Sequence, residues 1–456
     1  MYDIINFLEL EDDDLYILST TTEYDTKIIT LEKALKVHFC PHCGSRMYSR
    51  GKKIRTVKHP FLNPNGYKLI LILHQRRWKC NNHACGFTEN ESFPLVKKYK
   101  QTTNVSDLLI LSAFRNLNKT AEEIGREHNV SGHHAMNVFD KYVHMKRLPL
   151  SDIISIDEVY VEMDRYSKYA MVILDFFSGD VIDIVKNRQA KTTDPYFRAI
   201  PYEERCNVKY LITDMYNPYI NYVNKYFPNA VSVVDSFHVM QWIIRKIEQF
   251  IRALIKEYKH RDYENALANN PNKPIEEINV PVSDEVYLLQ SHRWVLLRNE
   301  ENIEYTKEPK YNKHFGRKMD TYAIQEKFMA INKDFFLIYE LKEEYVAFNS
   351  RNAGNPEQAA IEIEELIELY SDCTLNMFNE FANLLTTYKQ YIINSFVLGK
   401  RIIKGEVKES RLSNGPMESF NRKIKDAKRN SRGYTNFSHF RNRIIYATRD
   451  IQTLNL

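Results

Sequence analysis

Three acidic residues occupy positions where a carboxylate could bind a metal ion. Asp157 lies within the apolar run ISIDEVYVE, and Asp214 ends the apolar run VKYLITD. A buried carboxylate is unfavourable unless it is paired or binds a cation. Glu418 comes much later, in the segment NGPMESFNRKIKDAKRNSRGY, where basic residues crowd around it. Carboxylate oxygens are the ligands that Mg²⁺ prefers, so these acids are candidates for a magnesium site.

The segment around Glu418 has the period of a helix. Pro416 is a favourable first residue, and Met417, Phe420 and Ile424 form an apolar stripe that should face a core. A second face carries one acid, one amide and three cations, namely Glu418, Asn421, Arg422, Lys425 and Arg429. We expect the amide and the cations to face a DNA backbone. Glu418 is either a metal ligand or an ordinary first-turn acid that stabilises the helix dipole.

The elements around Asp157 and Asp214 are predicted from the hydrophobic pattern. Three strand-like runs, SDIISIDEVYVEM, YAMVILDFFSG and DVIDIVKNR, are followed by alternating helices and strands in the order α-β-α-β-α. This order indicates an RNase H-like fold with a mixed sheet and helices on its faces. Its first and fourth strands are adjacent, which would bring Asp157 and Asp214 together. With Glu418, two ions about 4 Å apart would support an in-line phosphoryl transfer.

Asp235 and His238 form a further polar pair at the end of the strand-like run AVSVVDSFHV. Asp235 could compete with Asp214 for a metal role, and His238 could contact the scissile phosphate or brace the site. We therefore treat both as active-site support. A packed, hydrogen-bonded histidine is the more frequent outcome for a residue such as His238.

Four of the six cysteines lie in one short region, in the runs FCPHCGSR and WKCNNHACGF. Cys40, Cys43, Cys80 and Cys85 stand at the ends of two strand-like runs, IRTVKH and YKLILILHQRRWKC, which the turn LNPNG joins. The pattern predicts a zinc ribbon with a closed structural Zn²⁺ site. His42 and His83 are alternative ligands, and unliganded cysteines are the alternative to a metal site. We expect nearby basic residues, among them Arg76 and Arg77, to contact DNA phosphates.

Three short helices are predicted between the ribbon and the strands, from SDLLILSAF to about Tyr142. Ser131 is a helix cap, and the apolar spacing of Ala121, Ile124, Val130, Ala135 and Val138 is similar to a helix-turn-helix. In such a motif the second helix enters the major groove. His133, His134 and Asn137 would then face the bases. A small helical linker domain is the alternative interpretation.

Length and charge bound the domain organisation and the partners. With 456 residues and a net charge of +5, the chain is long enough for several domains, and its basic residues gather in patches typical of a polyanion partner. We predict an N-terminal segment (1–36), a zinc ribbon (37–98), a helix-turn-helix domain (99–148), a catalytic domain in two parts (149–245 and 406–456) and an all-helical insertion (246–405). No apolar run reaches membrane-spanning length, so we expect a soluble protein of the cytoplasm.

The motifs taken together resemble those of DDE transposases of bacterial insertion sequences, of the ISL-three type. The matching runs are CPHCG, RRWKCNNHACGF, SIDEVYVE, ITDMYNPYI, FPNAVSVVDSFHV and the segment around Glu418 followed by FRNRI. The resemblance implies that Asp157, Asp214 and Glu418 are a catalytic triad for two Mg²⁺ ions, with Mn²⁺ as a substitute. It also implies cleavage and strand transfer of double-stranded DNA at terminal inverted repeats and into target DNA, by a homodimer or a larger assembly. The rival hypotheses are a catalytically silent DNA-binding regulator and a structure-specific nuclease.

Overall fold

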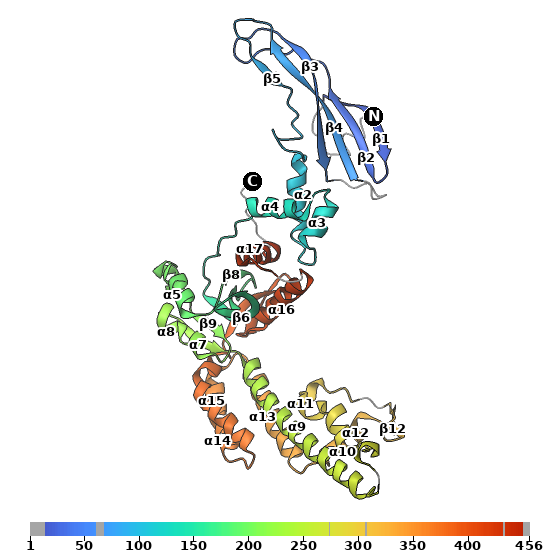
Figure 1. The fold of residues 1–456 in the computed structure, drawn as a ribbon. Coiled ribbons are helices and arrows are strands. Elements are labelled where there is room, and N and C mark those ends of the chain that lie inside the picture. Colours follow the sequence, from blue (N-terminus) through green and yellow to red (C-terminus); the bar gives the residue numbers. More distant parts are fainter. Residues whose placement is uncertain (1–13, 61–67, 273, 306–307, 432–433, 450–456) are drawn as a thin grey trace.

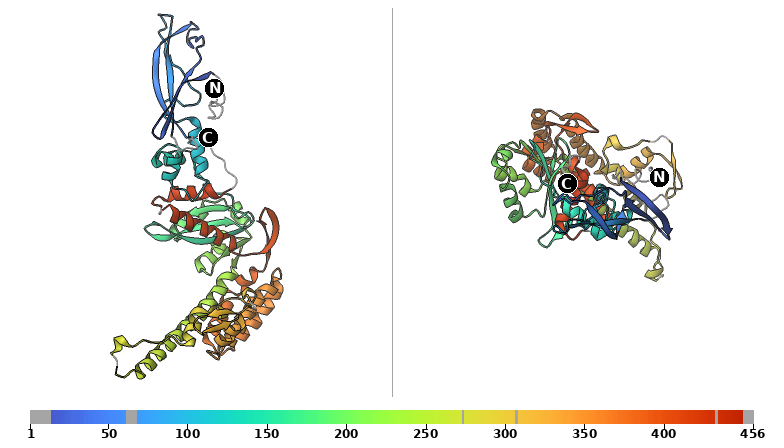
Figure 2. Two further views of the ribbon diagram at one scale, coloured as in Figure 1. Left: turned by 90° about the vertical axis from the view of Figure 1, so that its right-hand side faces the viewer. Right: turned by 90° about the horizontal axis from the view of Figure 1, so that it is seen from above.

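The computed structural model describes residues 14–60, 68–272, 274–305, 308–431 and 434–449. The described chain is elongated, with a β-rich part at one end, a helical part at the other and a mixed sheet between them (Figure 1). Two further views show the same succession (Figure 2). Residues 1–13 of the N-terminal segment, the predicted turn at 62–66 and residues 432–433 lie outside the described residues.

The N-terminal sheet contains two strands that the sequence analysis did not predict, β1 (Leu15–Glu23) and β2 (Thr26–Lys33). The strand order is β1-β2-β4-β3, and β5 (Thr88–Asn90) pairs with β4. As predicted, β3 (Met47–His59) and β4 (Lys68–Cys80) pair antiparallel, whereas β2 and β4 are parallel. The alternating apolar side chains of β2 and β4 pack into a small core of their own.

Three helices follow the N-terminal sheet: α2 (Asn104–Ala113), α3 (Ala121–Glu127) and α4 (Gly132–Tyr142). Thr120 and Glu123 form a capping box at the start of α3, and the Ser131 side chain accepts a hydrogen bond from the His134 N–H at the start of α4. A side chain at Gly125 would lie 2.6 Å from the backbone nitrogen of Gly132, so only glycine permits this close turn between α3 and α4.

The central sheet has the strand order β10-β9-β6-β7-β8. Its strands are β6 (Ile153–Asp164), β7 (Ser167–Asp175), β8 (Val181–Val185), β9 (Tyr210–Thr213) and β10 (Val231–Val234). Strands β6, β7 and β8 pair antiparallel, and β9 is parallel to both β6 and β10. The first and fourth predicted strands, β6 and β9, are therefore neighbours, as expected.

Helices cover both faces of the central sheet. The helices α5 (Ala190–Arg198), α6 (Tyr202–Cys206), α7 (Asn217–Ile220) and α8 (Tyr222–Tyr226) lie between β8 and β10 in the chain. Residues of α5, α7 and α8 form one core with the sheet, and α16 (Gly415–Asn430) and α17 (Phe437–Thr448) form a second core on its other face. Both of these last helices come from the far end of the chain.

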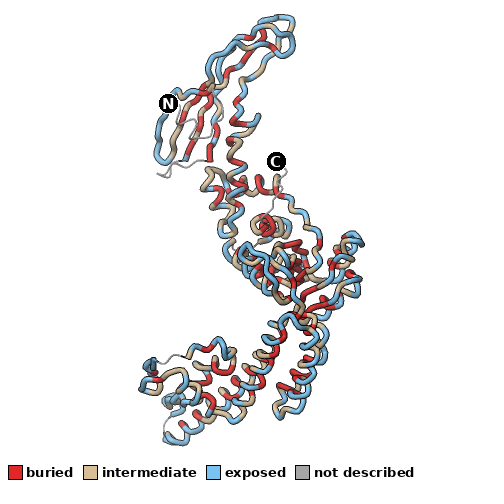
Figure 3. The backbone as a smooth tube through the Cα atoms, turned by 180° about the vertical axis from the view of Figure 1, so that it is seen from behind, coloured by how far each residue is buried: buried red, intermediate tan, exposed pale blue. Residues whose placement is uncertain are grey.

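The part of the chain between β10 and α16 is mainly helical. Its helices are α9 (Ser236–Ala268), α10 (Asp284–Ser291), α11 (Trp294–Leu297), α12 (Thr321–Met329), α13 (Phe335–Arg351), α14 (Pro356–Ser371) and α15 (Asn376–Asn394), with short 3₁₀ turns η1 (Ile275–Glu277) and η2 (Glu300–Asn302). Their apolar faces form a large core, which also includes Val234 of β10 and so joins this part to the edge of the central sheet. Figure 3 shows buried segments in each of these regions.

The prediction of an all-helical insertion is wrong in one respect, because this region contains two hairpins. They are formed by β11 (Lys310–Asn312) with β12 (Arg317–Met319) and by β13 (Leu398–Ile403) with β14 (Glu406–Arg411). Gly405, with φ of +82°, provides the left-handed turn of the second hairpin. Both hairpins are too short and too polar to stand out by periodicity. Helix α9 and the second hairpin each cross a predicted domain boundary without interruption.

Candidate active site and zinc site

The three aspartates lie level with one another on three adjacent strands. Ser155 of β6 pairs with Ile212 of β9, and Val234 of β10 pairs with Thr213 of β9. Continuing these parallel registers places Asp157 beside Asp214, and Asp214 beside Asp235. Asp214 directly follows β9 and Asp235 directly follows β10, at the carboxyl ends where side chains of parallel strands converge.

Glu418 reaches the same place from the first turn of α16. The carboxylates of Asp235 and Glu418 and the imidazole of His238 each offer an atom within 4.8 Å of the others. His238 Nε2 is buried and has no hydrogen-bond partner among the described residues. Two carboxylates and an unpartnered imidazole nitrogen are a donor set that fits a divalent cation.

Burial raises the pKa values of all four acids, and repulsion from a neighbouring carboxylate adds to this effect for Asp157 and Glu418. Burial and, to a smaller extent, the charge of the neighbouring Asp214 raise the pKa of Asp157 to about 6. Burial also raises the pKa values of Asp214, Asp235 and Glu418. The charge of His238 lowers the pKa of each of the four carboxyl groups. All four acids therefore lie near His238, and a cation among them would favour their charged forms.

The grouping differs in detail from the predicted triad. Glu418 lies with Asp235 and His238, whereas Asp157 and Asp214 belong to no three-residue ligand group of 4.8 Å within the described ranges. The site thus has two parts, one formed by Asp157 and Asp214 and the other by Asp235 and Glu418. Asp235 and His238, which the sequence analysis treated as active-site support, lie next to Glu418. The metal-binding roles of all five residues stay predictions.

Asn421 does not face outward with the basic residues of α16, as the sequence analysis expected. Its side chain is only 6% exposed and donates a hydrogen bond of 2.8 Å to Asp157 Oδ2. The other carboxylate oxygen, Oδ1, accepts a hydrogen bond of 2.7 Å from the Glu158 N–H. Because α16 packs against β6, the helix position of Asn421 points toward the strand. Asn421 therefore orients Asp157.

The remaining basic residues of α16 are exposed. Arg422 and Lys425 lie on the solvent side of the helix, and Arg429 is also exposed but donates a hydrogen bond of 2.7 Å to Asp426. Arg422 is close enough to Glu418 to lower the pKa of its carboxyl group. A positively charged surface thus begins directly beside the acids.

Two residues predicted to contact DNA are placed differently from the expectation. Arg76 is buried and forms ion pairs with Glu32 and Glu91, so its charge is used within the N-terminal sheet, whereas Arg77 is exposed. On α4, His133 and Asn137 are exposed. His134 is half-buried with its Nε2 turned inward, and burial lowers its pKa.

The four predicted zinc ligands converge at the end of the β3–β4 hairpin. The sulfurs of Cys40, Cys43, Cys80 and Cys85 all lie within 4.8 Å of one another, and the Cys40 and Cys85 sulfurs are 3.8 Å apart. In a tetrahedral site with Zn–S bonds of 2.3 Å, neighbouring sulfurs are about 3.8 Å apart. The thiols are free of disulfides, so the donor set and its spacing fit a structural Zn²⁺ ion.

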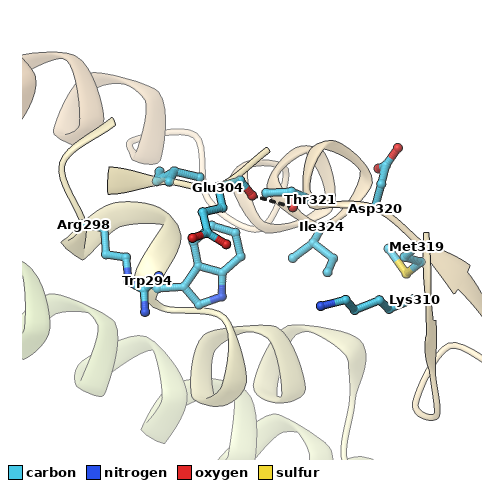
Figure 4. Close-up of a pocket in the computed structure, with 9 residues that line it drawn as sticks. Trp294, Arg298, Glu304, Lys310, Met319, Asp320, Thr321 and Ile324 are labelled. Atoms are coloured by element: carbon cyan, nitrogen blue, oxygen red, sulfur yellow. Dashed lines mark hydrogen bonds between the residues drawn. The ribbon is translucent and has the colours of Figure 1, made fainter. Parts of the chain in front are cut away.

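A separate pocket of about 230 Å³ lies within the helical insertion (Figure 4). Trp294, Arg298, Glu304 and Lys310 are among the side chains that line it, and none of the four acids does. The sequence analysis weighed Trp294 as a base-stacking or a core residue. Its ring packs against the insertion core, and its indole N–H donates a hydrogen bond of 3.3 Å to His292 Nδ1.

A smaller helical feature was not expected from the sequence. The side chain of Arg443 in α17 donates hydrogen bonds to the carbonyl oxygens of Asn116 and Lys119, at 2.7 and 3.1 Å. The Tyr446 hydroxyl donates to the Leu111 carbonyl at 3.0 Å. Helix α17 therefore fastens the α2–α4 unit to the central sheet. No pattern in the sequence pairs residues so far apart.

Among the described residues, no helix combines the length and apolarity that a membrane crossing requires.

The sequence of the chain is similar to those of known transposases. Residues 36–85, which include all four clustered cysteines, match the zinc-finger of transposase IS204/IS1001/IS1096/IS1165. The transposase for insertion sequence element IS1001 of Bordetella parapertussis is 24% identical over 286 residues, which is 61% of this chain and 63% of that protein. Residues 154–444, more than half of the chain, match the ISL3 transposase family. The chain therefore belongs to the ISL3 family of transposases.

Proposed function

We propose that this protein binds the terminal inverted repeats of an insertion sequence, cleaves DNA at its ends and joins the freed 3′-hydroxyl to target DNA. The observation that carries this proposal is the placement of four wholly or partly buried carboxylates around His238 in a chain of the ISL3 transposase family. The strand order β10-β9-β6-β7-β8, with helices on both faces, supports an RNase H-like catalytic domain. Divalent cations suit such a site because they would neutralise the clustered charges.

Asp157, Asp214, Asp235 and Glu418 would hold Mg²⁺, or Mn²⁺ in its place. When bound, such ions activate the attacking oxygen and stabilise the leaving oxygen of a phosphoryl transfer. The protein supplies the positioning. Two hydrogen bonds, from Asn421 and from the Glu158 N–H, fix the orientation of the Asp157 carboxylate. His238 offers a positive charge or a ligand nitrogen at the point where the four acids meet.

DNA recognition would be divided between two regions of the elongated chain. The zinc ribbon and the α3–α4 unit, as a helix-turn-helix, would bind the repeats, with His133 and Asn137 of α4 toward the bases. The exposed cations Arg422, Lys425 and Arg429 of α16 would bind the phosphate backbone near the acids. Two ends must be processed together in this reaction, so we propose a dimer or a larger assembly.

A catalytically silent regulator is the second candidate function. It would keep the zinc ribbon and the DNA-binding helices. It would have no use for a cluster of carboxylates whose charged forms are made unfavourable by burial. All four acids are present and converge, which favours the enzyme.

The test is cleavage of a labelled DNA fragment that carries an end of the element, in Mg²⁺ and in EDTA. Asp157→Asn should lower the cleavage rate by a factor of about 100 or more and leave end binding unchanged, because electrostatic groups of this kind contribute that much. Asp152→Asn is the matched control, since Asp152 is an exposed acid next to the start of the same strand. Equal cleavage by both variants would contradict the role of Asp157. Binding without cleavage in the wild type would favour the regulator.

A further inference from the structure

A pocket of about 350 Å³ opens beside the proposed metal ligands. Asp235 and Glu418 are among the residues that line it. The first turn of α9, the last turns of α13 and residues around η2 line it as well. The pocket therefore lies where the helical insertion meets the central sheet, next to the position of the reacting phosphate in the proposed function.

The walls of this pocket differ in chemistry. Phe237, Met240 and Val346 provide apolar surface, whereas Asn299, Glu301 and Ser350 provide amide, carboxylate and hydroxyl groups. Among the described residues, no lysine or arginine lines the pocket, and three carboxylates do. A phosphate group would be repelled by these acids. A flat group with apolar faces and polar edges fits this combination, and nucleobases have that form.

Phe237 is an exposed aromatic side chain in the lining of this pocket. It is the second residue of α9 and is 46% exposed, although Ser236 and His238 on either side of it are half-buried. Its ring meets only the His238 ring among the aromatic contacts of the described residues, edge to face at 5.8 Å. One face of an aromatic ring beside the metal ligands is thus available for stacking.

We propose that this pocket receives an unpaired nucleobase of the DNA strand next to the cleaved phosphate, with Phe237 stacked on the base. Glu301 would accept a hydrogen bond from an exocyclic amino group, so adenine, cytosine and guanine would be preferred to thymine. The inference rests on the proposed function and adds a base-binding site to it. The pocket around Trp294 does not offer this, because two cations line it and no proposed metal ligand does.

The experiment uses the full chain and the labelled element end, in paired form and with an abasic site at each nucleotide flanking the cleavage position in turn. Phe237→Ala should cleave the paired fragment about ten-fold more slowly than the wild type, since stacking on an aromatic side chain is worth about 1–3 kcal/mol per base. With the abasic site at the nucleotide that enters the pocket, both proteins should cleave at the same rate. Phe237→Tyr, which keeps the ring, should behave like the wild type.

Phe336→Ala is the matched control, because Phe336 is 61% exposed on α13 and does not line the pocket. It should match the wild type on every fragment. The proposal is overturned if Phe237→Ala equals the wild type on paired DNA, or if it is slower by the same factor on every abasic fragment. The second result would assign Phe237 a structural role.

A binding measurement in EDTA separates this proposal from the proposed function. A 2-aminopurine placed at the pocket nucleotide should brighten when the wild type binds, because an unstacked base loses its quenching neighbours. It should stay dim with Phe237→Ala. Brightening without any cleavage in Mg²⁺ would support the base pocket and contradict the transposase reaction. Cleavage without brightening at any flanking nucleotide would contradict the base pocket alone.

Glu301→Gln tests the preference among bases. A glutamine both donates and accepts, so this variant should reduce the difference in cleavage rate between fragments with adenine and with thymine at the pocket nucleotide. An unchanged difference would remove Glu301 from the proposed recognition.

Discussion

At the scale of single residues, the proposed active site brings together several negative charges. Burial raises the pKa of each of its four acids, Asp157, Asp214, Asp235 and Glu418. Such a cluster is unfavourable by itself, and one imidazole offsets it only in part. A bound divalent cation would lower the free energy of the charged forms. A divalent cation would therefore both stabilise the charged carboxylates and serve the proposed phosphoryl transfer.

Asn421 should act through Asp157. Asn421→Ala removes a hydrogen bond to a charged group, which contributes about 1.5–3 kcal/mol. We expect cleavage to slow about ten-fold or more, while the affinity for DNA ends stays the same. Single-turnover cleavage and a binding titration measure the two quantities.

Asn430→Ala is the control for that experiment, because Asn430 is exposed on the same helix and bonds only to Asn118 in the described structure. It should leave cleavage unchanged. Weaker DNA binding with normal cleavage of the bound ends in Asn421→Ala would return Asn421 to the DNA-facing role that the sequence suggested.

The residues that could be predicted were those with a local signature. Asp157 and Asp214 interrupt or end apolar runs, and the cysteines have the spacing of a zinc ribbon. Arg76 and Asn421 were misplaced because their partners, Glu32, Glu91 and Asp157, are far away in the sequence. Whether a polar side chain faces solvent or a distant carboxylate depends on tertiary contacts that periodicity does not contain.

At the scale of elements, α16 joins two functions on one helix. Its apolar stripe of Met417, Phe420 and Ile424 is buried against the central sheet, as the period predicts. That packing fixes Glu418 near the acids and leaves Arg422 and Lys425 in solvent. The strand pairing was predictable because parallel runs joined by helices permit few arrangements, whereas β1, β2 and both later hairpins lacked a clear signal.

Arg422→Ala should weaken DNA binding and reduce its salt dependence. Each phosphate contact that is lost lowers the slope of log K against log salt by about 1. Binding titrations at several salt concentrations measure this slope. Arg252→Ala is the control, because Arg252 is an exposed arginine of α9 in the insertion. An unchanged slope in Arg422→Ala would remove this face of α16 from the DNA interface.

Cys40→Ser should release zinc and weaken end binding, because three thiolates and a hydroxyl hold the ion less well than four thiolates. Elemental analysis gives the zinc content, and a binding titration gives the affinity. Cys373→Ser changes a cysteine outside the cluster, so it should leave the zinc content and the affinity for DNA ends unchanged. Full zinc content in Cys40→Ser would argue against the four-cysteine site.

At the scale of the whole molecule, the order of parts along the chain matches a division of labour. The zinc site and the α2–α4 unit lie on one side of the central sheet, and the helical insertion lies on the other (Figure 1). Helix α17 links the α2–α4 unit to the sheet through Arg443 and Tyr446. DNA held by the N-terminal parts would therefore be presented to the acids at a fixed position.

The interior placement of the insertion was predictable from its helical pattern, because it separates Asp214 from Glu418 in the sequence. The contribution of the insertion to the pocket beside Glu418 could not be predicted from the sequence. Asn299 and Glu301 belong to the segment around η2, Ser350 belongs to the end of α13, and all three line the pocket beside Glu418. Contacts between helices at such sequence distances follow from the packing of the whole core.

The most direct test of the central claim is joining of paired, labelled element ends to a target plasmid by the wild type and by Glu418→Gln, in Mg²⁺ and in EDTA. The account predicts metal-dependent cleavage and joining by the wild type, and normal end binding without either reaction by Glu418→Gln. Joining at the wild-type rate by Glu418→Gln would contradict it, and Glu418 would then serve only the first turn of α16.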